Sequence, residues 1–189
     1  MTTPNSELLE TANNAFNSGD FYLSEALYRE FLATSPSSLE AMLKLSHLYM
    51  QDGRNKLAIP LLSKAINLDP TNPYSYYNLG LAYQQSEDSH LAVQYYKAAL
   101  AIKPGFPLAL NNLGVTLQHI GDIELANRYF TQAFSWDTDC FEAYFNYAQS
   151  HKFAAKDFDL LKMLEQKLDC DTIEDEKKNS LVLYLGQSL

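Results

Sequence analysis

The chain has 189 residues, a mass of 21.4 kDa and a net charge of −9, and 47% of its residues are hydrophobic. This apolar content is enough for a packed core and excludes an intrinsically disordered protein. Binding to a phosphate backbone needs clustered Lys and Arg, and the sequence has no such cluster, so we expect no nucleic-acid partner.

The amino-terminal sequence and the cysteines favour a cytoplasmic protein. The first ten residues, MTTPNSELLE, lack the basic start and apolar run of a secretory signal. No stretch of about 18 uncharged apolar residues occurs, so we expect neither a membrane span nor a membrane partner. Cys140 and Cys170 have neither metal-binding nor redox spacing, which is typical of reduced thiols.

A pattern of small residues and prolines recurs every 34 residues along the chain. Its members are Ala12, Ser46, Gly80, Gly114 and Ala148, and then Pro36, Pro70 and Pro104. This period is typical of stacked pairs of antiparallel helices. Each pair is amphipathic and buries its apolar face by stacking on its neighbours. The sequence therefore predicts an all-α, right-handed superhelical solenoid of repeats.

Four repeats of this kind are predicted in chain order. They span residues 1–38, which match the pattern weakly, and then residues 39–72, 73–106 and 107–140. In each, a proline is expected to end the second helix, because proline cannot continue a helix. Thr138 replaces this proline in the fourth repeat, so we expect a less firmly defined end there.

Signals for helix starts agree with these boundaries. Ser37 and Glu40 have the spacing of a capping box before the second repeat. Pro73 and Pro107 suit the first position of a helix, where the missing amide hydrogen costs nothing.

The carboxyl-terminal part of the chain departs from the period. Residues 141–172 are predicted as a divergent fifth repeat, and residues 173–189 as a terminal helix whose small residue, Gly186, follows Ala148 by 38 residues instead of 34. This helix is interpreted either as a cap that closes the array or as half of a further repeat in a longer chain. Because it is apolar, it could also pair with a copy of itself.

The third repeat resembles the tetratricopeptide repeat. The family pattern is a large residue, Leu-Gly, Tyr, Ala, an aromatic residue, Ala and Pro. The matching residues are Tyr76, Leu79, Gly80, Tyr83, Ala92, Tyr96, Ala99 and Pro104. The resemblance implies a solenoid whose first helices line an inner surface, and a protein or peptide as the partner.

One position of the first helices, two places before the small residue, is expected on this inner surface. It holds Asn78, Asn112 and Asn146 in repeats three to five. An asparagine amide offers two donors and an acceptor, so three in file could pair with the backbone of an extended peptide. The row resembles the asparagine ladder of the O-GlcNAc transferase repeat domain. The alternative is that these amides bond neighbouring carbonyls between repeats and bind nothing.

The segments around this row are free of charge. Residues 74–86 and 107–120 contain no Asp, Glu, Lys or Arg. Solvated helical faces are usually charged, whereas exposed Tyr and Asn suit recognition surfaces. Further candidates for the groove are Tyr74, Tyr77, Gln84, Asn111, Gln118 and His47. We expect no carboxylate clamp of the kind that binds chaperone tails. Such a clamp needs Lys, Asn and Arg on the inner helices, and of the corresponding residues in this chain only Asn78 matches.

No catalytic residue, metal site or cofactor is predicted. The four histidines do not pair at metal-ligand spacing, no HExxH or CxxC motif occurs, and the seven glycines are isolated. The sequence therefore predicts a non-catalytic scaffold that holds an extended segment of a protein partner in a concave groove.

An alternative function comes from the last 47 residues, which resemble the junction between repeats and catalytic part in bacterial tetratricopeptide-repeat sulfotransferases. The residues that carry it are Lys152, Phe153, Leu161, Leu164, Leu168, Glu174, Asp175, Leu185 and Gly186. The resemblance implies the substrate-docking region of a larger transferase such as a sulfotransferase. The sulfuryl-donor phosphate loop would follow Leu189, so this chain by itself is not expected to transfer sulfate. A truncated remnant with no present role is the third alternative.

Overall fold

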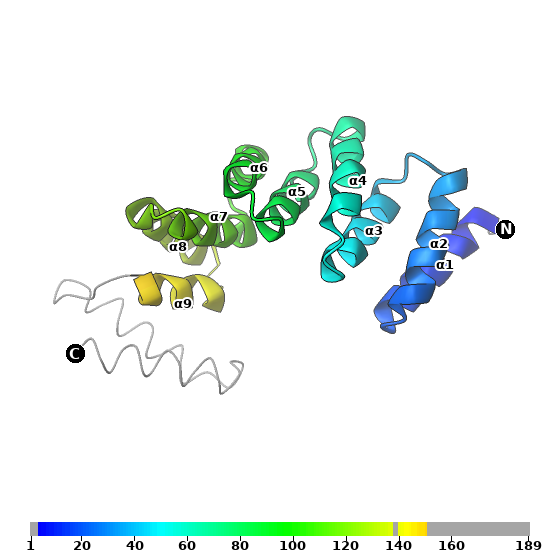
Figure 1. Ribbon diagram of the computed structural model, residues 1–189, viewed down its shortest axis with the longest axis horizontal. Helices are drawn as coiled ribbons and strands as arrows, with labels where there is room; N and C mark the ends of the chain where they lie inside the picture. Colours follow the sequence, from blue (N-terminus) through cyan, green and yellow to red (C-terminus); the bar gives the residue numbers. More distant parts are fainter. Residues whose placement is uncertain (1–3, 138–139, 151–189) are drawn as a thin grey trace. The chain divides into compact units, whose positions relative to one another are not determined.

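The computed structural model describes residues 4–137 and 140–150, and the elements in this part of the chain are helices (Figure 1). They are α1 (Pro4–Asn17), α2 (Phe21–Thr34), α3 (Leu39–Gln51), α4 (Asn55–Leu68), α5 (Pro73–Gln85), α6 (Ser89–Ile102), α7 (Pro107–His119), α8 (Ile123–Trp136) and α9 (Phe141–Ser150). Over these residues no strand occurs, and the all-α repeat fold predicted from the 34-residue period is confirmed.

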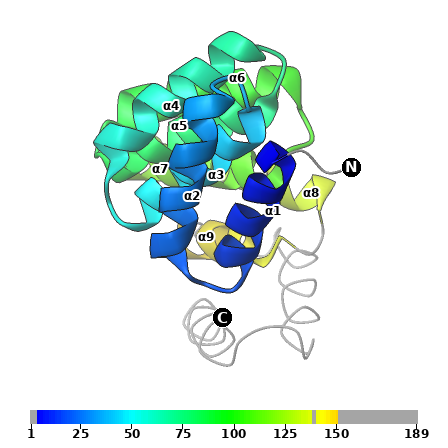
Figure 2. The same cartoon turned by 90° about the vertical axis from the view of Figure 1, so that its right-hand side faces the viewer.

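The chain divides into two compact units, Met1–Pro104 and Gly105–Leu189. In the first unit, three helical hairpins follow one another, and α2 packs on α3 and α4 on α5. Figure 2 shows α1 and α2 side by side, as the two members of one hairpin. In the second unit, α7 and α8 form a hairpin and α9 packs against both.

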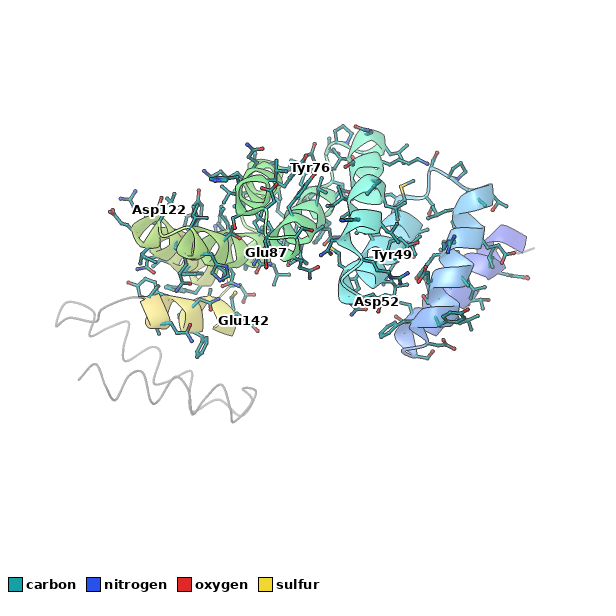
Figure 3. The ribbon with its side chains drawn as sticks, viewed as in Figure 1. Tyr49, Asp52, Tyr76, Glu87, Asp122 and Glu142 are labelled. Carbon is teal, nitrogen blue, oxygen red and sulfur yellow. The ribbon has the colours of Figure 1, made fainter. Side chains whose placement is uncertain are left out.

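Aspartate caps begin three of the second helices. Asp20, Asp88 and Asp122 each accept a hydrogen bond at 3.1–3.2 Å from the amide three residues further on (Asp122 is labelled in Figure 3). Such a cap satisfies one of the amides that a helix start leaves without a partner. In α4 the equivalent residue is Arg54, whose side chain makes no cap.

The first helices begin differently. The expected capping box of Ser37 and Glu40 is wrong, because the cap of α3 is Ser38, whose hydroxyl accepts an amide hydrogen bond at 3.4 Å. The carboxylate of Glu40 instead accepts a hydrogen bond of 2.9 Å from a side chain of α1. Pro73 and Pro107 occupy the first turn of α5 and α7, as predicted.

The second helices end at equivalent places in all four hairpins. α2, α4 and α6 stop two residues before Pro36, Pro70 and Pro104. α8 stops at the equivalent Trp136, although the sequence has Thr138 in place of proline. α8 thus ends without a proline, and Thr138 itself, on which the expectation of a less firmly defined end rests, lies outside the described residues. The amide of Asp137 bonds the carbonyl of Ala133 and closes the last turn as in the other hairpins.

Two glycines allow an aromatic ring of the second helix to lie directly on the first. A Cβ atom on Gly80 would lie 2.8 Å from the ring of Tyr96, and one on Gly114 would overlap the ring of Phe130. Neither ring has any exposed surface. The small residue of the 34-residue pattern therefore sets the distance between the helices of each of these hairpins.

The single tryptophan of the chain lies on a third glycine. A Cβ atom on Gly105 would be 2.9 Å from the Trp136 ring, so the ring covers the backbone just before α7. The other side of Trp136 faces solvent, since 63% of the residue is exposed.

The turn inside each hairpin needs a residue with positive φ. Gly19, Gly53 and Gly121 supply it with φ of 81°, 69° and 90°, and the equivalent residue of the α5–α6 turn is Glu87, with φ of 63° (Figure 3). A residue other than glycine costs about 1–2 kcal/mol in this left-handed region of backbone conformation, because its Cβ approaches the following carbonyl oxygen.

We expect Glu87→Gly to raise the free energy of unfolding by about 1 kcal/mol, because relief of the backbone strain exceeds the added entropy of glycine in the unfolded chain. Urea denaturation followed by circular dichroism measures this change. The reverse substitution in the α3–α4 turn, Gly53→Glu, should lower the same quantity. A loss of stability in Glu87→Gly would show that this turn carries no strain.

Candidate interaction surface

The predicted asparagine row divides between the two units. Asn78 lies on α5 of the first unit, Asn112 on α7 and Asn146 on α9 of the second, and all three are partly buried. In the second unit, Asn146 Nδ2 donates to Asn111 Oδ1 at 2.9 Å, and Asn111 Nδ2 donates to Asn112 Oδ1 at 3.3 Å. A chain of side-chain amides therefore joins α9 to α7.

Asn111 is the middle member of this chain and is only 7% exposed. The expectation that Asn111 faces the groove is therefore wrong, because its amide lies between α7 and α9 and is bonded on both sides. Asn146 also uses a donor inside the fold. For Asn146 alone, this agrees with the alternative in which an asparagine of the row bonds a neighbouring repeat.

Of the two tyrosines of α5 that the sequence predicts in the groove, Tyr74 exposes its ring to solvent. The residue is 48% exposed, Lys103 Nζ lies 5.2 Å from the ring centroid, and the same ammonium donates to the phenol oxygen at 3.3 Å. A cation over an aromatic face is a favourable contact. Tyr77 is partly buried, with its ring centroid 5.9 Å from that of Tyr96. Tyr77 therefore contributes to the packing of its own hairpin.

The predicted glutamines occupy equivalent places at the ends of α5 and α7. Gln84 Oε1 accepts a hydrogen bond of 2.6 Å from the hydroxyl of Tyr96. Gln118 is partly buried, and the equivalent ring, Phe130, has no hydroxyl to offer. Gln84 is thus held by its own hairpin, through a contact that the sequence does not reveal without the packing of α6 on α5.

His47 belongs to a small cluster between α1 and α3. Its ring centroid is 5.8 Å from that of Phe16, and Lys44 Nζ lies 4.4 Å from the same Phe16 centroid. Burial lowers the pKa of His47, and the nearby Lys44 lowers it further. Both effects favour the neutral imidazole of His47.

Two further kinds of site, for metal ions and for membranes, are absent from the part of the chain that the structure describes. Among these residues, no group of three or more His, Cys, Asp or Glu side chains could hold a metal ion. Nor does any described helix have the length and apolar character needed to cross a membrane.

Sequence reasoning missed a cluster of charges around Arg54. Both terminal nitrogens of Arg54 bond the carboxylate of Glu25, at 3.1 and 2.6 Å, and Nη2 lies 2.7 Å from Asp52. The hydrogen bond from Arg54 lowers the pKa of Glu25. The guanidinium also lies 4.8 Å from the ring centroid of Tyr49 (Tyr49 and Asp52 are labelled in Figure 3). The signal was the replacement, at Arg54, of the aspartate that caps the other second helices.

Comparison with protein families identifies the repeats. Residues 47–86 match a family described as TPR repeat, and residues 73–106 and 108–140 each match a family described as tetratricopeptide repeat. The chain contains tetratricopeptide repeats. The matched tetratricopeptide segments include helices α4 to α8 and therefore Tyr74, Asn78 and Asn112. No curated protein matches the chain.

Solved tetratricopeptide-like structures resemble this one over most of its length. MamA 41-end from Desulfovibrio magneticus RS-1 has a TM-score of 0.76 and 17% identity, over 90% of this chain and 99% of that chain. PilF of Pseudomonas aeruginosa has a TM-score of 0.77 and 17% identity, over 97% and 83%. At this identity the likeness concerns the fold. A Thermobaculum terrenum O-GlcNAc transferase mutant is 28% identical, with a TM-score of 0.65, over 71% of this chain and 27% of that chain.

Proposed function

We propose that the chain is a non-catalytic protein-interaction scaffold, which holds an extended segment of a partner protein on the uncharged faces of its first helices. The observation that carries this proposal is the exposure of Tyr74 and Leu108. They lie 34 residues apart, at equivalent places on α5 and α7, and are 48% and 54% exposed. An exposed large apolar side chain in a segment without charge suits a recognition surface.

The asparagines have different parts in this proposal. Asn78 and Asn112 remain candidates for hydrogen bonds to the backbone of the bound segment, since both are partly exposed on these helices. Asn146 holds the buried Asn111, so its main contribution is to the packing of α9. Of the three predicted asparagines, Asn78 in the first unit and Asn112 in the second are therefore kept in the proposal, each within its own unit.

The test begins with peptides selected from a displayed library against the full chain. Affinities of a selected peptide are then compared by fluorescence anisotropy for the original chain, for Tyr74→Ala and for the double variant Asn78→Ala with Asn112→Ala. We expect the double variant to lose about tenfold in affinity, since two hydrogen bonds contribute roughly 1–3 kcal/mol together. We expect a loss of similar size in Tyr74→Ala, which removes the exposed ring. Asn67→Ala, an exposed asparagine on α4, is the matched control.

An affinity within about twofold in the double variant would mean that these amides do not read the peptide. Asn146→Ala is measured separately, because loss of its bond to Asn111 should lower the free energy of unfolding by about 1 kcal/mol. A variant in which Asn78, Asn112 and Asn146 are all replaced by alanine would combine this loss of stability with any loss of affinity, so it is not used.

A second candidate function is the substrate-docking region of a larger transferase. The observation that favours it is the 28% identity to an O-GlcNAc transferase of which this chain covers 27%. The predicted sulfotransferase junction falls mainly on residues 151–189, which lie outside the described residues. The intact mass of the natural product, measured from source cells, distinguishes the two functions. A mass near 21.4 kDa supports the scaffold, and a larger product supports the docking region.

Self-association through the terminal helix, residues 173–189, also stays a prediction, since these residues lie outside the described part. Sedimentation equilibrium of the full chain and of a Leu183→Lys variant would test it. The prediction requires a dimer that the charged variant loses.

A further inference from the structure

The last residue of α8 is the single tryptophan of the chain, and most of its surface is exposed. Trp136 is 63% exposed, whereas the equivalent residues of the first unit, Leu68 and Ile102, are 44% and 39% exposed. A large exposed apolar side chain is unfavourable in water, and aromatic residues are enriched where proteins bind one another. The fourth repeat therefore exposes a larger apolar surface at this place than the two repeats before it.

One face of the Trp136 ring is covered by backbone. A Cβ atom on Gly105 would lie 2.9 Å from the ring, so the glycine leaves the space in which the ring rests on the chain. The residues equivalent to this glycine in the two preceding repeats are Ser37 and Thr71, each paired with an aliphatic residue in place of the tryptophan. The exposure of Trp136 leaves the opposite face of the ring open to solvent. Glycine and tryptophan thus occur together, and they hold a flat aromatic surface towards solvent.

The residues that follow Trp136 are acidic. Asp137 is the next residue, and Glu142 lies in the first turn of α9 (labelled in Figure 3), and both are exposed. Burial raises the pKa of the Cys140 thiol, and the nearby carboxylates of Glu142 and Asp137 raise it further. Both carboxylates therefore contribute negative potential at the same place, directly after α8. The carboxyl end of α8 adds to this potential, since the last carbonyls of a helix carry a partial negative charge.

No described cation of the second unit neutralises this charge. Arg128 is the one Lys or Arg in the part of this unit that the structure describes, and it bonds Glu124 at 2.8 Å in the middle of α8. Lys103 lies just before the second unit, and its ammonium contacts Tyr74 of the first unit. An anionic partner such as a phosphate backbone is therefore disfavoured at this place, whereas a cationic side chain is attracted.

We propose that Trp136 binds an arginine side chain of a partner protein. The guanidinium stacks on the open face of the indole, because the face of an aromatic ring attracts a cation and tryptophan does so most strongly. Its planar, delocalised charge suits stacking better than the ammonium of lysine. The carboxylates of Asp137 and Glu142 add to this attraction. The site lies at the end of α8, and its assignment does not depend on the first-helix surface proposed above.

An NMR titration of the full chain with acetyl-Gly-Arg-Gly-Arg-Gly-amide tests the site directly. The control peptide has citrulline in place of each arginine, which keeps the shape and removes the charge. Because the chain has a single tryptophan, its indole N–H gives one signal. We expect a saturable shift of this signal, with about fivefold tighter binding of the arginine peptide, and no saturable shift of the Gly121 amide at the other end of the hairpin. Equal affinity for the two peptides, or equal shifts at both ends, would overturn the proposal.

Variants test the residues themselves, with a fluorescein-labelled arginine peptide and fluorescence anisotropy. Trp136→Leu introduces the residue that the second repeat has at the equivalent Leu68, so we expect the fold to be kept and the affinity to fall about fivefold. Asp137→Asn combined with Glu142→Gln should weaken binding about threefold at low salt and make it less dependent on salt. Ile120→Ala, at an apolar residue of the same unit that is 45% exposed, is the matched control. An affinity within twofold of the original in Trp136→Leu would overturn the assignment.

Discussion

Replacing Gly114 by serine will lower the free energy of unfolding by about 2 kcal/mol. The new Cβ would overlap the Phe130 ring, which has no exposed surface and therefore no open space to move into. Overpacking of this kind costs about 1–3 kcal/mol. Serine has the better helix propensity, but only by about 0.5 kcal/mol, so the steric cost decides the sign.

The second hairpin of the chain suggests the compensating change. At the places equivalent to Gly114 and Phe130 it has Ser46 and Leu62, and both are completely buried. The larger first residue is thus paired with a smaller second one. We expect Gly114→Ser combined with Phe130→Leu to be only about 1 kcal/mol less stable than the original chain, although the two single losses add to about 3 kcal/mol.

Urea denaturation of the four proteins, followed by circular dichroism, completes this double-mutant cycle. A coupling energy of at least about 1 kcal/mol is expected, because the two side chains compete for the same volume. If the free energy of unfolding of the double variant fell by the sum of the two single losses, the prediction would be wrong. Glycine would then be required at position 114 for its backbone conformation and not for the space that it leaves to Phe130.

Stability should also fall at alkaline pH as the buried Tyr28 loses its proton. Burial and the nearby Glu40 carboxylate raise the pKa of Tyr28 to about 12, and its hydroxyl donates to Asn13 Oδ1 at 2.6 Å. The folded chain then holds the phenol proton more tightly than the unfolded chain, in which the tyrosine pKa is about 10. The contribution is complete below pH 10 and is lost as the pH rises from 10 to 12, by about 1.4 kcal/mol at pH 11.

Tyr28→Phe removes this titration and isolates it from the other tyrosines. Between pH 8 and pH 11 the free energy of unfolding of the original chain should fall by about 1.4 kcal/mol more than that of the variant. Tyr22→Phe, at a tyrosine that is 90% exposed, is the matched control. Parallel pH profiles for the original chain and Tyr28→Phe would contradict the prediction.

Features of the fold that depend on local rules were predictable from the sequence. Proline disfavours the continuation of a helix, and Pro36, Pro70 and Pro104 indeed follow three helix ends by two residues, although Pro60 lies inside α4. A small residue is needed where two helices meet, and Gly80 and Gly114 lie under buried rings. The same rule does not explain the end of α8, where the sequence has no equivalent proline and the amide of Asp137 bonds the carbonyl of Ala133.

The candidate surface was less predictable, because its residues depend on contacts between helices. Asn111 and Asn112 are adjacent in sequence, and only the packing of α9 decides which of them is buried. Gln84 accepts the hydroxyl of Tyr96, a bond that requires the position of α6. At Arg54 the break in the aspartate pattern is visible in the sequence, whereas the buried Asn55 beside it is not.

The contact of Trp136 with Gly105 gives the second unit its own spectroscopic reporter. Trp136 is the one tryptophan of the chain, and its ring lies on backbone of the second unit, Gly105–Leu189. Its fluorescence will therefore follow the unfolding of that unit, while circular dichroism follows the helices of both. Coincident transitions mean that the array unfolds as one cooperative block. Separate transitions mean that the second unit unfolds independently of the first, and each unit then has its own free energy of unfolding.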